Sequence, residues 1–140
     1  MEENFLEILM IEDNQADVLL VKEYFKEGKL KNHLHIVNDG VEALEFLKHK
    51  GNYKNVPKPD IILLDLHMPK KDGRQVLKEI KADKWLKEIP VVVLTPSEDE
   101  IDFLKEENLN ADSFVSKPVN TEKFMEVAVS IGLNYHLSLL

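Results

Sequence analysis

The sequence predicts a single α/β domain in which a parallel β-sheet is covered by helices on both faces. Short apolar runs alternate five times with segments of helical periodicity, which is the pattern of repeated strand–helix units. Three of the runs are apolar without alternation, as strands buried on both faces require. The length of 140 residues fits one domain with a sizeable core.

The first half of the chain contains two strand–helix units. Residues 6–11 (LEILMI) are a short apolar run, and residues 33–37 (HLHIV) alternate like a strand. Residues 14–26 and 41–50 have helical periodicity, and residues 51–59 (GNYKNVPKP) are rich in turn formers and predict a loop. Each helix is predicted from three apolar residues on one stripe: Val18, Val21 and Phe25, then Val41, Leu44 and Leu47.

The second half repeats the unit three times. Strands are predicted at 61–64 (IILL), 89–94 (IPVVVL) and 112–116 (DSFVS), where apolar or β-branched residues dominate. Helices are predicted at 74–82, 97–107 and 120–131, the last of them with Phe124, Val127 and Ile131 on one side.

Residues with capping chemistry mark the helix ends. Gly28 is expected to stop the first helix, and Asn38 or Asp39 to cap the second. Ser97 and Glu100 have the spacing of a capping box, followed by an acidic first turn.

Composition excludes several classes of function. Without cysteine the chain has no disulfide, no thiol catalysis and no Cys-ligated zinc. A net charge of −8 argues against direct binding of DNA or RNA. The N-terminus carries acids where a signal peptide needs positive charge, and no apolar stretch is long enough to span a membrane. We therefore expect a soluble, cytoplasmic protein that binds neither nucleic acid nor membrane.

Polar or ionisable residues follow the predicted strands. Glu12 and Asp13 follow the first, Asp65 the third, Thr95 the fourth and Lys117 the fifth. Each alone is unremarkable, since an acid after a strand is often only a helix cap. In an open parallel sheet, however, these positions meet at one edge, where such folds bind their ligands.

This set of side chains suits phosphoryl transfer. Clustered carboxylates repel one another, and a divalent cation with a preference for oxygen, such as Mg²⁺, would offset the repulsion. A lysine and a hydroxyl can stabilise charge on phosphoryl oxygens, and an aspartate can form an acyl phosphate.

The same residues resemble the receiver domain of two-component response regulators. The resemblance rests on Glu12-Asp13, on Asp65 within DLHMPKKDG, on Thr95 and on Lys117-Pro118, and it covers about residues 5–133. It implies a flavodoxin-like (CheY-like) doubly wound (βα)5 fold with strand order 2-1-3-4-5. The stretches after Gly73 and at 89–95 further resemble stand-alone receivers that partner phytochrome-type or other soluble histidine kinases.

The resemblance implies a role for each of these residues. Asp65 would accept a phosphoryl group from a histidine kinase or phosphotransfer protein. Asp13, Asp65 and the backbone carbonyl of His67 would bind Mg²⁺, with Glu12 acting through a metal-bound water. Thr95 and Lys117 would bind phosphoryl oxygens. The protein would act as a phosphorylated switch, with no enzymatic activity beyond its own phosphotransfer and autodephosphorylation.

Further expectations come from the same resemblance. Phe114 matches the position of the family's switch aromatic, although aromatic residues in short strands are mostly core. Lys117-Pro118 would be a cis peptide. We expect the phosphorylated state to act on a downstream protein, because no room remains for a DNA-binding output domain.

Pro96 departs from the family pattern, which has a small residue after the threonine. Proline lacks an N–H and stiffens the loop, so one interpretation is altered phosphorylation kinetics or a muted switch. The other is that Pro96 simply starts the next helix. His67, two residues after Asp65, is a second candidate for kinetic tuning. Position 12 is Glu where many members have Asp, and both offer oxygen ligands.

Two other functions fit parts of the pattern. A haloacid-dehalogenase-type phosphatase also uses a strand-end Asp, Mg²⁺ and a lysine, but it needs a second acid where this chain has His67. An inert pseudo-receiver is disfavoured by the complete set of site residues. The apolar tail at 134–140 also suggests a homodimer through the last strand, the last helix and the tail.

Overall fold

The computed structural model describes residues 5–28, 30–68 and 71–133, which form five strands, five α-helices and one short 3₁₀ helix. The strands are β1 (Leu6–Ile11), β2 (Asn32–Val37), β3 (Ile61–Asp65), β4 (Val91–Thr95) and β5 (Ser113–Ser116). The helices are α1 (Gln15–Glu27), α2 (Gly40–Leu47), η1 (Gly51–Tyr53), α3 (Gly73–Ala82), α4 (Glu98–Glu106) and α5 (Thr121–Ser130). Nearly all boundaries lie within two residues of those expected from the sequence.

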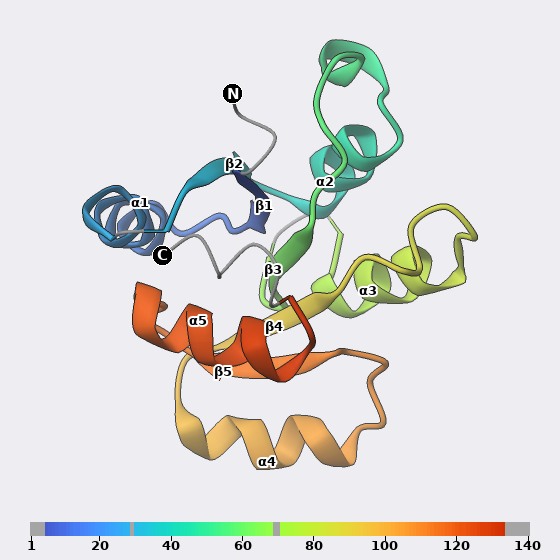
Figure 1. The fold of residues 1–140 in the computed structure, drawn as a ribbon. Coiled ribbons are helices and arrows are strands. Elements are labelled where there is room, and N and C mark those ends of the chain that lie inside the picture. Colours follow the sequence, from blue (N-terminus) through green and yellow to red (C-terminus); the bar gives the residue numbers. More distant parts are fainter. Residues whose placement is uncertain (1–4, 29, 69–70, 134–140) are drawn as a thin grey trace.

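All strand pairs are parallel, and the sheet order is β2-β1-β3-β4-β5, which confirms the predicted topology. Helices α1 and α5 cover one face of the sheet, and α2, α3 and α4 cover the other (Figure 1). Strand β3 lies at the centre between β1 and β4, and every one of its residues is buried. The chain order reverses direction at β1, so β1 and β3 form the switch point of the sheet.

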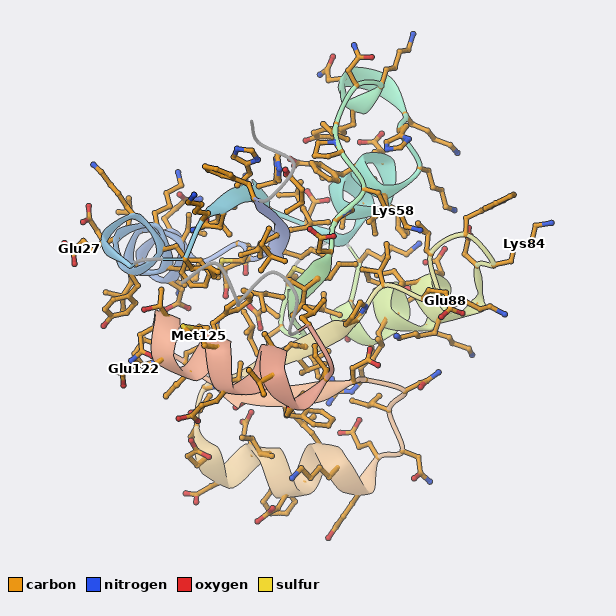
Figure 2. The ribbon with its side chains drawn as sticks, in the orientation of Figure 1. Glu27, Lys58, Lys84, Glu88, Glu122 and Met125 are labelled. Atoms are coloured by element: carbon orange, nitrogen blue, oxygen red, sulfur yellow. The ribbon has the colours of Figure 1, made fainter. Side chains whose placement is uncertain are left out.

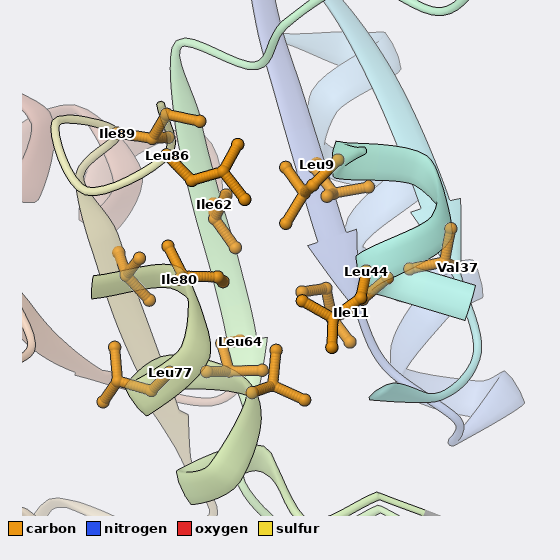
Figure 3. Packing of buried hydrophobic residues seen from close by; sticks show 14 of the residues in the cluster. Leu9, Ile11, Val37, Leu44, Ile62, Leu64, Leu77, Ile80, Leu86 and Ile89 are labelled. Carbon is orange, nitrogen blue, oxygen red and sulfur yellow. The ribbon is translucent and has the colours of Figure 1, made fainter. Parts of the chain in front are cut away.

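The core has two parts, one on each face of the sheet. On the face of α2 and α3, side chains of Leu9, Ile11, Ile62 and Leu64 point toward the helices (Figure 3). They meet apolar side chains from α2, α3 and the segment before β4: Leu44, Leu77, Ile80, Leu86 and Ile89. Burying a large aliphatic side chain contributes about 1.5–3 kcal/mol, so this packing holds the strand ends in fixed positions.

The charged side chains labelled in Figure 2 point away from the sheet into solvent: Glu27, Lys58, Lys84, Glu88 and Glu122. Charges this exposed need no partner, so the charged groups that require explanation are the buried ones: Glu12, Asp39 and Asp65. No helix within the described ranges is long and apolar enough to cross a bilayer.

Helix caps were predicted with mixed success. Asp39 caps α2 through its side chain, and Gly28 is the C-cap of α1, both as expected. Asn14, which was not predicted as a cap, caps the start of α1. The predicted capping box in α4 is wrong: Ser97 is the N-cap residue, but its side chain makes no capping hydrogen bond. Pro96 precedes that cap, so it does not occupy the first helical position.

Helix α2 also differs from its prediction. It ends at Leu47 instead of residue 50, and Val41, predicted for the buried stripe, is 48% exposed. The next residues explain the early end, because His49 adopts a positive φ and the chain then turns into η1. The predicted loop 51–59 therefore contains one short helical turn. Residues 134–140, on which the predicted tail contact depends, lie outside the described residues.

Candidate functional site

The candidate site lies at the carboxyl edge of the sheet, around the end of β3. Asp65 is the last residue of β3, Thr95 is the last of β4, and Glu12 directly follows β1. Glu12 N–H donates to the carbonyl of Val37 at 3.0 Å, which extends the β1–β2 ladder by one residue and fixes the backbone there. Because β1 and β4 both flank β3, three polar side chains emerge beside one another.

Three carboxylates meet at this edge as predicted. Each of Glu12, Asp13 and Asp65 offers one carboxylate oxygen, and these oxygens all lie within 4.8 Å of one another. Glu12 is fully buried, Asp65 is 4% exposed and Asp13 is half-buried. An arrangement of oxygen atoms alone suits a hard divalent cation, and ligands from only two strand ends leave space for water or substrate oxygens.

Lys117 supplies the positive charge in the cleft. Its Nζ lies 2.7 Å from Oε1 of Glu12 and 3.5 Å from Oδ2 of Asp65. It also donates to Oδ2 of Asp17 at 2.8 Å. The side chain of Lys117 is mostly buried, so these contacts are only weakly screened by solvent. The lysine predicted from its position after β5 is therefore in place beside Asp65.

The electrostatics of the cleft show an excess of negative charge. Among the residues that the structure describes, four carboxylates, from Glu12, Asp13, Asp17 and Asp65, lie in the cleft with the ammonium group of Lys117. Burial raises the pKa of Glu12 to about 7, and hydrogen bonding with Asp65 adds to the effect against the pull of Lys117. Burial alone would lower the pKa of Lys117, but its hydrogen bond to Asp17 and its ion pair with Glu12 outweigh this, and the pKa is raised. A divalent cation would offset this excess charge, so the residues present fit such an ion.

Two further predicted residues border Asp65. The backbone N–H of His67 donates to Oδ1 of Asp65 at 3.1 Å, while the His67 side chain is exposed. Thr95 is fully buried, and its hydroxyl donates to the carbonyl of Ser97 at 2.9 Å. The hydroxyl also lies 3.5 Å from the carbonyl of Val115 in β5, and Pro96, exposed, lies between Thr95 and Ser97.

Close packing explains why position 73, at the end of the DLHMPKKDG stretch, is a glycine. A Cβ at Gly73 would lie 2.6 Å from the carbonyl oxygen of Asp65 and 2.5 Å from Cα of Leu66. The N–H of Gly73 also donates to the carbonyl of Leu66 at 3.2 Å. The start of α3 therefore packs directly on the backbone that carries Asp65, which no larger residue allows without displacement.

The remaining predicted residues lie on β5 and just after it. Phe114 is half-buried and packs against the core on the α2, α3 and α4 face of the sheet, where it pairs with Val93 in the strand register. The peptide bond between Lys117 and Pro118 is cis, as expected. Phe114 is therefore not among the residues that meet at the acidic cluster.

Sequence reasoning missed Asp17. It lies in the first turn of α1, where acids are common for helix-dipole reasons and carry no signal of function. Only the fold brings it to Lys117, one hundred residues further along the chain. Its position in the predicted helix, four residues after Asp13, was the only available hint.

Comparison with known proteins gives a consistent result. The family model of the response regulator receiver domain matches residues 8–129. The response regulator Rcp1 of Synechocystis sp. (strain ATCC 27184 / PCC 6803 / Kazusa) is 44% identical over 124 residues, which is 89% of this chain and 84% of that protein.

Solved structures of response regulators share the fold. The bacteriophytochrome response regulator AtBRR has a TM-score of 0.84 and 36% identity, with 91% of this chain and 93% of that one covered. The Mn²⁺-bound form of Rcp1 has a TM-score of 0.72 and 45% identity, with 87% and 88% covered. The phosphorylated cyanobacterial phytochrome response regulator RcpA has a TM-score of 0.73 and 39% identity, with 97% and 96% covered.

Proposed function

The chain belongs to the response regulator receiver family, and we propose that Asp65 is its phosphoacceptor. The family places the chain in phosphorylation-based signalling. The observation that supports Asp65 is its position: a buried carboxylate at the end of the central strand, with Lys117 at 3.5 Å and two other carboxylates beside it. One relative, RcpA, has been solved in its phosphorylated form.

We propose Mg²⁺ as the cofactor. Asp13, Asp65 and the backbone carbonyl of His67 would hold it, with Glu12 contributing directly or through water. The oxygen cluster and its excess negative charge support this, and Rcp1 has been solved in a Mn²⁺-bound form. When bound, the ion supplies positive charge that offsets the charge of the transferred phosphoryl group.

The chain's own residues would divide the remaining work. An oxygen of Asp65 forms a bond to phosphorus while the bond from phosphorus to the donor's histidine nitrogen breaks, and the nitrogen keeps the electron pair. Lys117 donates to a phosphoryl oxygen. The Thr95 hydroxyl leaves the carbonyl of Ser97, its present acceptor, and donates to another phosphoryl oxygen.

The movement of Thr95 would carry the signal to the surface. Thr95 ends β4, and Phe114 lies on the neighbouring strand β5. A shift of Thr95 toward Asp65 changes the space available at the β4–β5 end of the sheet, and Phe114 is the large side chain there that is only half-buried. Thr95 would thus have two positions, one at Ser97 and one toward Asp65. Phosphorylation would change the populations of these two conformations, and that change would be the signal.

The partners follow from this role. A sensor histidine kinase or a phosphotransfer protein would donate the phosphoryl group in the cytoplasm, and a downstream protein would recognise the changed surface. A homodimer through β5, α5 and residues 134–140 is a further proposal. Autodephosphorylation would end the signal, and His67, exposed beside Asp65, is placed to influence it.

Intact-mass measurement after incubation with acetyl phosphate and Mg²⁺ tests the proposal. We expect one phosphoryl adduct per chain in the wild type and none in Asp65→Asn. Matched Asp60→Asn, which changes an acid at the opposite end of the same strand, should retain the adduct. Rapid turnover of many phosphate esters would instead indicate a phosphatase, and no adduct in the folded wild type would indicate an inert receiver.

A further inference from the structure

Asp17 is the cleft residue for which neither the family motif nor the strand ends give a reason. Its Oδ2 accepts a hydrogen bond from Nζ of Lys117 at 2.8 Å, and its side chain is 31% exposed. Its backbone N–H separately donates to Oδ1 of Asn14 at 3.0 Å, which is the N-cap contact of α1. The carboxylate is thus not needed for the cap, and its contact in the cleft is the lysine.

The hydrogen-bonding capacity of Lys117 defines what Asp17 can do. An ammonium group has three donors and no acceptor. Asp17 accepts from one donor at 2.8 Å, and Glu12 Oε1, 2.7 Å from Nζ, is an ion-pair neighbour without a hydrogen bond of its own, while the 3.5 Å distance to Asp65 leaves the third donor without a close partner. That third donor is the one available to an oxygen of a group carried by Asp65.

Glu12 and Asp17 differ in their relation to the acidic cluster. Glu12 belongs to the group whose oxygens lie within 4.8 Å of one another, whereas Asp17 does not. A cation held by that cluster attracts Glu12 and repels Lys117, so the contact between Glu12 and the lysine is weakened when the cation is present. Asp17 is then the acceptor that still holds the ammonium group in the cleft.

We propose that Asp17 is a positioning residue, which keeps the ammonium group of Lys117 beside Asp65 when a divalent cation engages Glu12. The inference rests on the proposed phosphoacceptor function and extends it to a residue in α1. Without Asp17, Lys117 pairs with Glu12 or turns into solvent. A smaller fraction of the protein then has the third donor of Lys117 directed at the phosphoryl oxygens. In the opposite role, Asp17 would hold the lysine away from the phosphoryl group, and loss of Asp17 would speed up phosphorylation instead of slowing it.

Three variants separate these roles. Asp17→Asn removes the charge but keeps the backbone cap and the size, and Asp17→Glu restores a carboxylate. Glu23→Gln, at an exposed position on the same helix, is the matched control for the change in net charge. The measurements are the rate of adduct formation with acetyl phosphate and saturating Mg²⁺, and the Mg²⁺ affinity by calorimetry.

We expect Asp17→Asn to form the adduct about tenfold more slowly, which corresponds to the loss of one charge-assisted hydrogen bond in the transition state. Glu23→Gln should stay within about twofold, and Asp17→Glu should recover most of the rate. Mg²⁺ affinity should fall only slightly more in Asp17→Asn than in Glu23→Gln, because Asp17 is not a ligand and its loss only lets Lys117 compete with the cation for Glu12.

Several outcomes would overturn the inference. Faster adduct formation in Asp17→Asn would make Asp17 a competitor for Lys117. Equal slowing in Asp17→Asn and Asp17→Glu would show that shape matters and charge does not, and a loss of Mg²⁺ affinity as large as that in Asp13→Asn would make Asp17 a metal ligand. An unchanged rate refutes only the role of Asp17, whereas the absence of an adduct in the wild type refutes the phosphoacceptor proposal itself.

Discussion

The two ends of the β-sheet both carry clustered charged side chains, but their charges are balanced differently. At the carboxyl end, within the described part of the chain, the ammonium of Lys117 contacts the carboxylates of Glu12, Asp17 and Asp65, and Asp13 lies in the same cluster. At the amino end, one carboxylate is shared by two imidazoles. Oε2 and Oε1 of Glu7 lie 2.6 Å from Nδ1 of His33 and 2.8 Å from Nε2 of His35.

The pKa values of Glu7 and Glu12 shift in opposite directions because of this difference. Burial alone would raise the pKa of Glu7, but the hydrogen bonds to His33 and His35 outweigh it, and the pKa is lowered. Burial and Asp65 raise the pKa of Glu12 to about 7. The amino-end cluster is therefore satisfied by the fold and stabilises it, whereas the carboxyl-end cluster holds charge that the fold itself does not satisfy. Excess charge of this kind is typical of a functional site.

Removing Lys117 should give the largest effect. Lys117→Met leaves the buried Glu12 and Asp65 without a cation, so we expect the free energy of unfolding at pH 8 without Mg²⁺ to fall by about 3 kcal/mol. Lys81→Met is the control, because Lys81 is also mostly buried but pairs with the more exposed Asp112. It should lose about 1 kcal/mol at most. Urea denaturation measures both, and equal losses would contradict the contrast between paired and unbalanced charge.

The pH dependence of stability should separate the two ends next. The pKa of Glu12 is about 7 in the folded state, above the ordinary value of 4.5 expected when unfolded. Its stabilising contribution is then complete below pH 4.5 and is lost as pH rises through 7. We expect a fall of about 3 kcal/mol without metal that is missing in Glu12→Gln. The difference between the two proteins is the readout, because groups that do not contact Glu12 titrate equally in both.

Mg²⁺ should reverse this loss. At pH 8 and about 100 times its dissociation constant, the ion should add about 2.7 kcal/mol to the free energy of unfolding, since it binds the folded protein alone. Chelation should remove the gain. A wild-type profile that Mg²⁺ leaves unchanged would show that the excess carboxylates do not form a cation site.

Changing the amino-end cluster should have a smaller effect with the opposite pH dependence. The lowered pKa of Glu7 means that its contribution is present above the unfolded value of 4.5 and is lost as pH falls through the folded pKa. Glu7→Gln should therefore cost about 1 kcal/mol at pH 7, and the difference from the wild type should close below pH 4.5. Adduct formation and Mg²⁺ affinity should not change in this variant. A loss of either would show that the charges at the amino end of the sheet affect the site at the carboxyl end.

The same comparison explains what the sequence can predict. Residues that follow strands, such as Asp65, Thr95 and Lys117, were predicted together because the ends of parallel strands must meet at one edge. Asp17 and the contact of Glu7 with His33 were not, because they join a helix to a distant loop and an inner strand to an edge strand. Neither contact leaves a local pattern. Val41 and Ser97 failed for a related reason: periodicity and spacing indicate a helix, but tertiary packing decides which side is buried and whether a cap forms.

The smallest predicted effect concerns two prolines at opposite ends of β4. Pro90 directly precedes the strand, and its carbonyl accepts from the N–H of Ile62 at 2.9 Å. Pro96 directly follows the strand, between Thr95 and its present acceptor Ser97. Replacing either by alanine frees the unfolded chain, so both changes should lower the free energy of unfolding by about 0.4–1 kcal/mol.

Only Pro96→Ala should also change the kinetics. It restores a backbone N–H near the phosphoryl position and loosens the loop that must release the Thr95 hydroxyl, so we expect adduct formation or adduct lifetime to increase by about three-fold. Pro90→Ala should change neither rate, because it alters the end of the strand where charges are already balanced. Indistinguishable rates in both directions for the two variants would show that Pro96 only leads into α4. A kinetic change in Pro90→Ala alone would show that the strand as a whole, and not its carboxyl end, limits the switch.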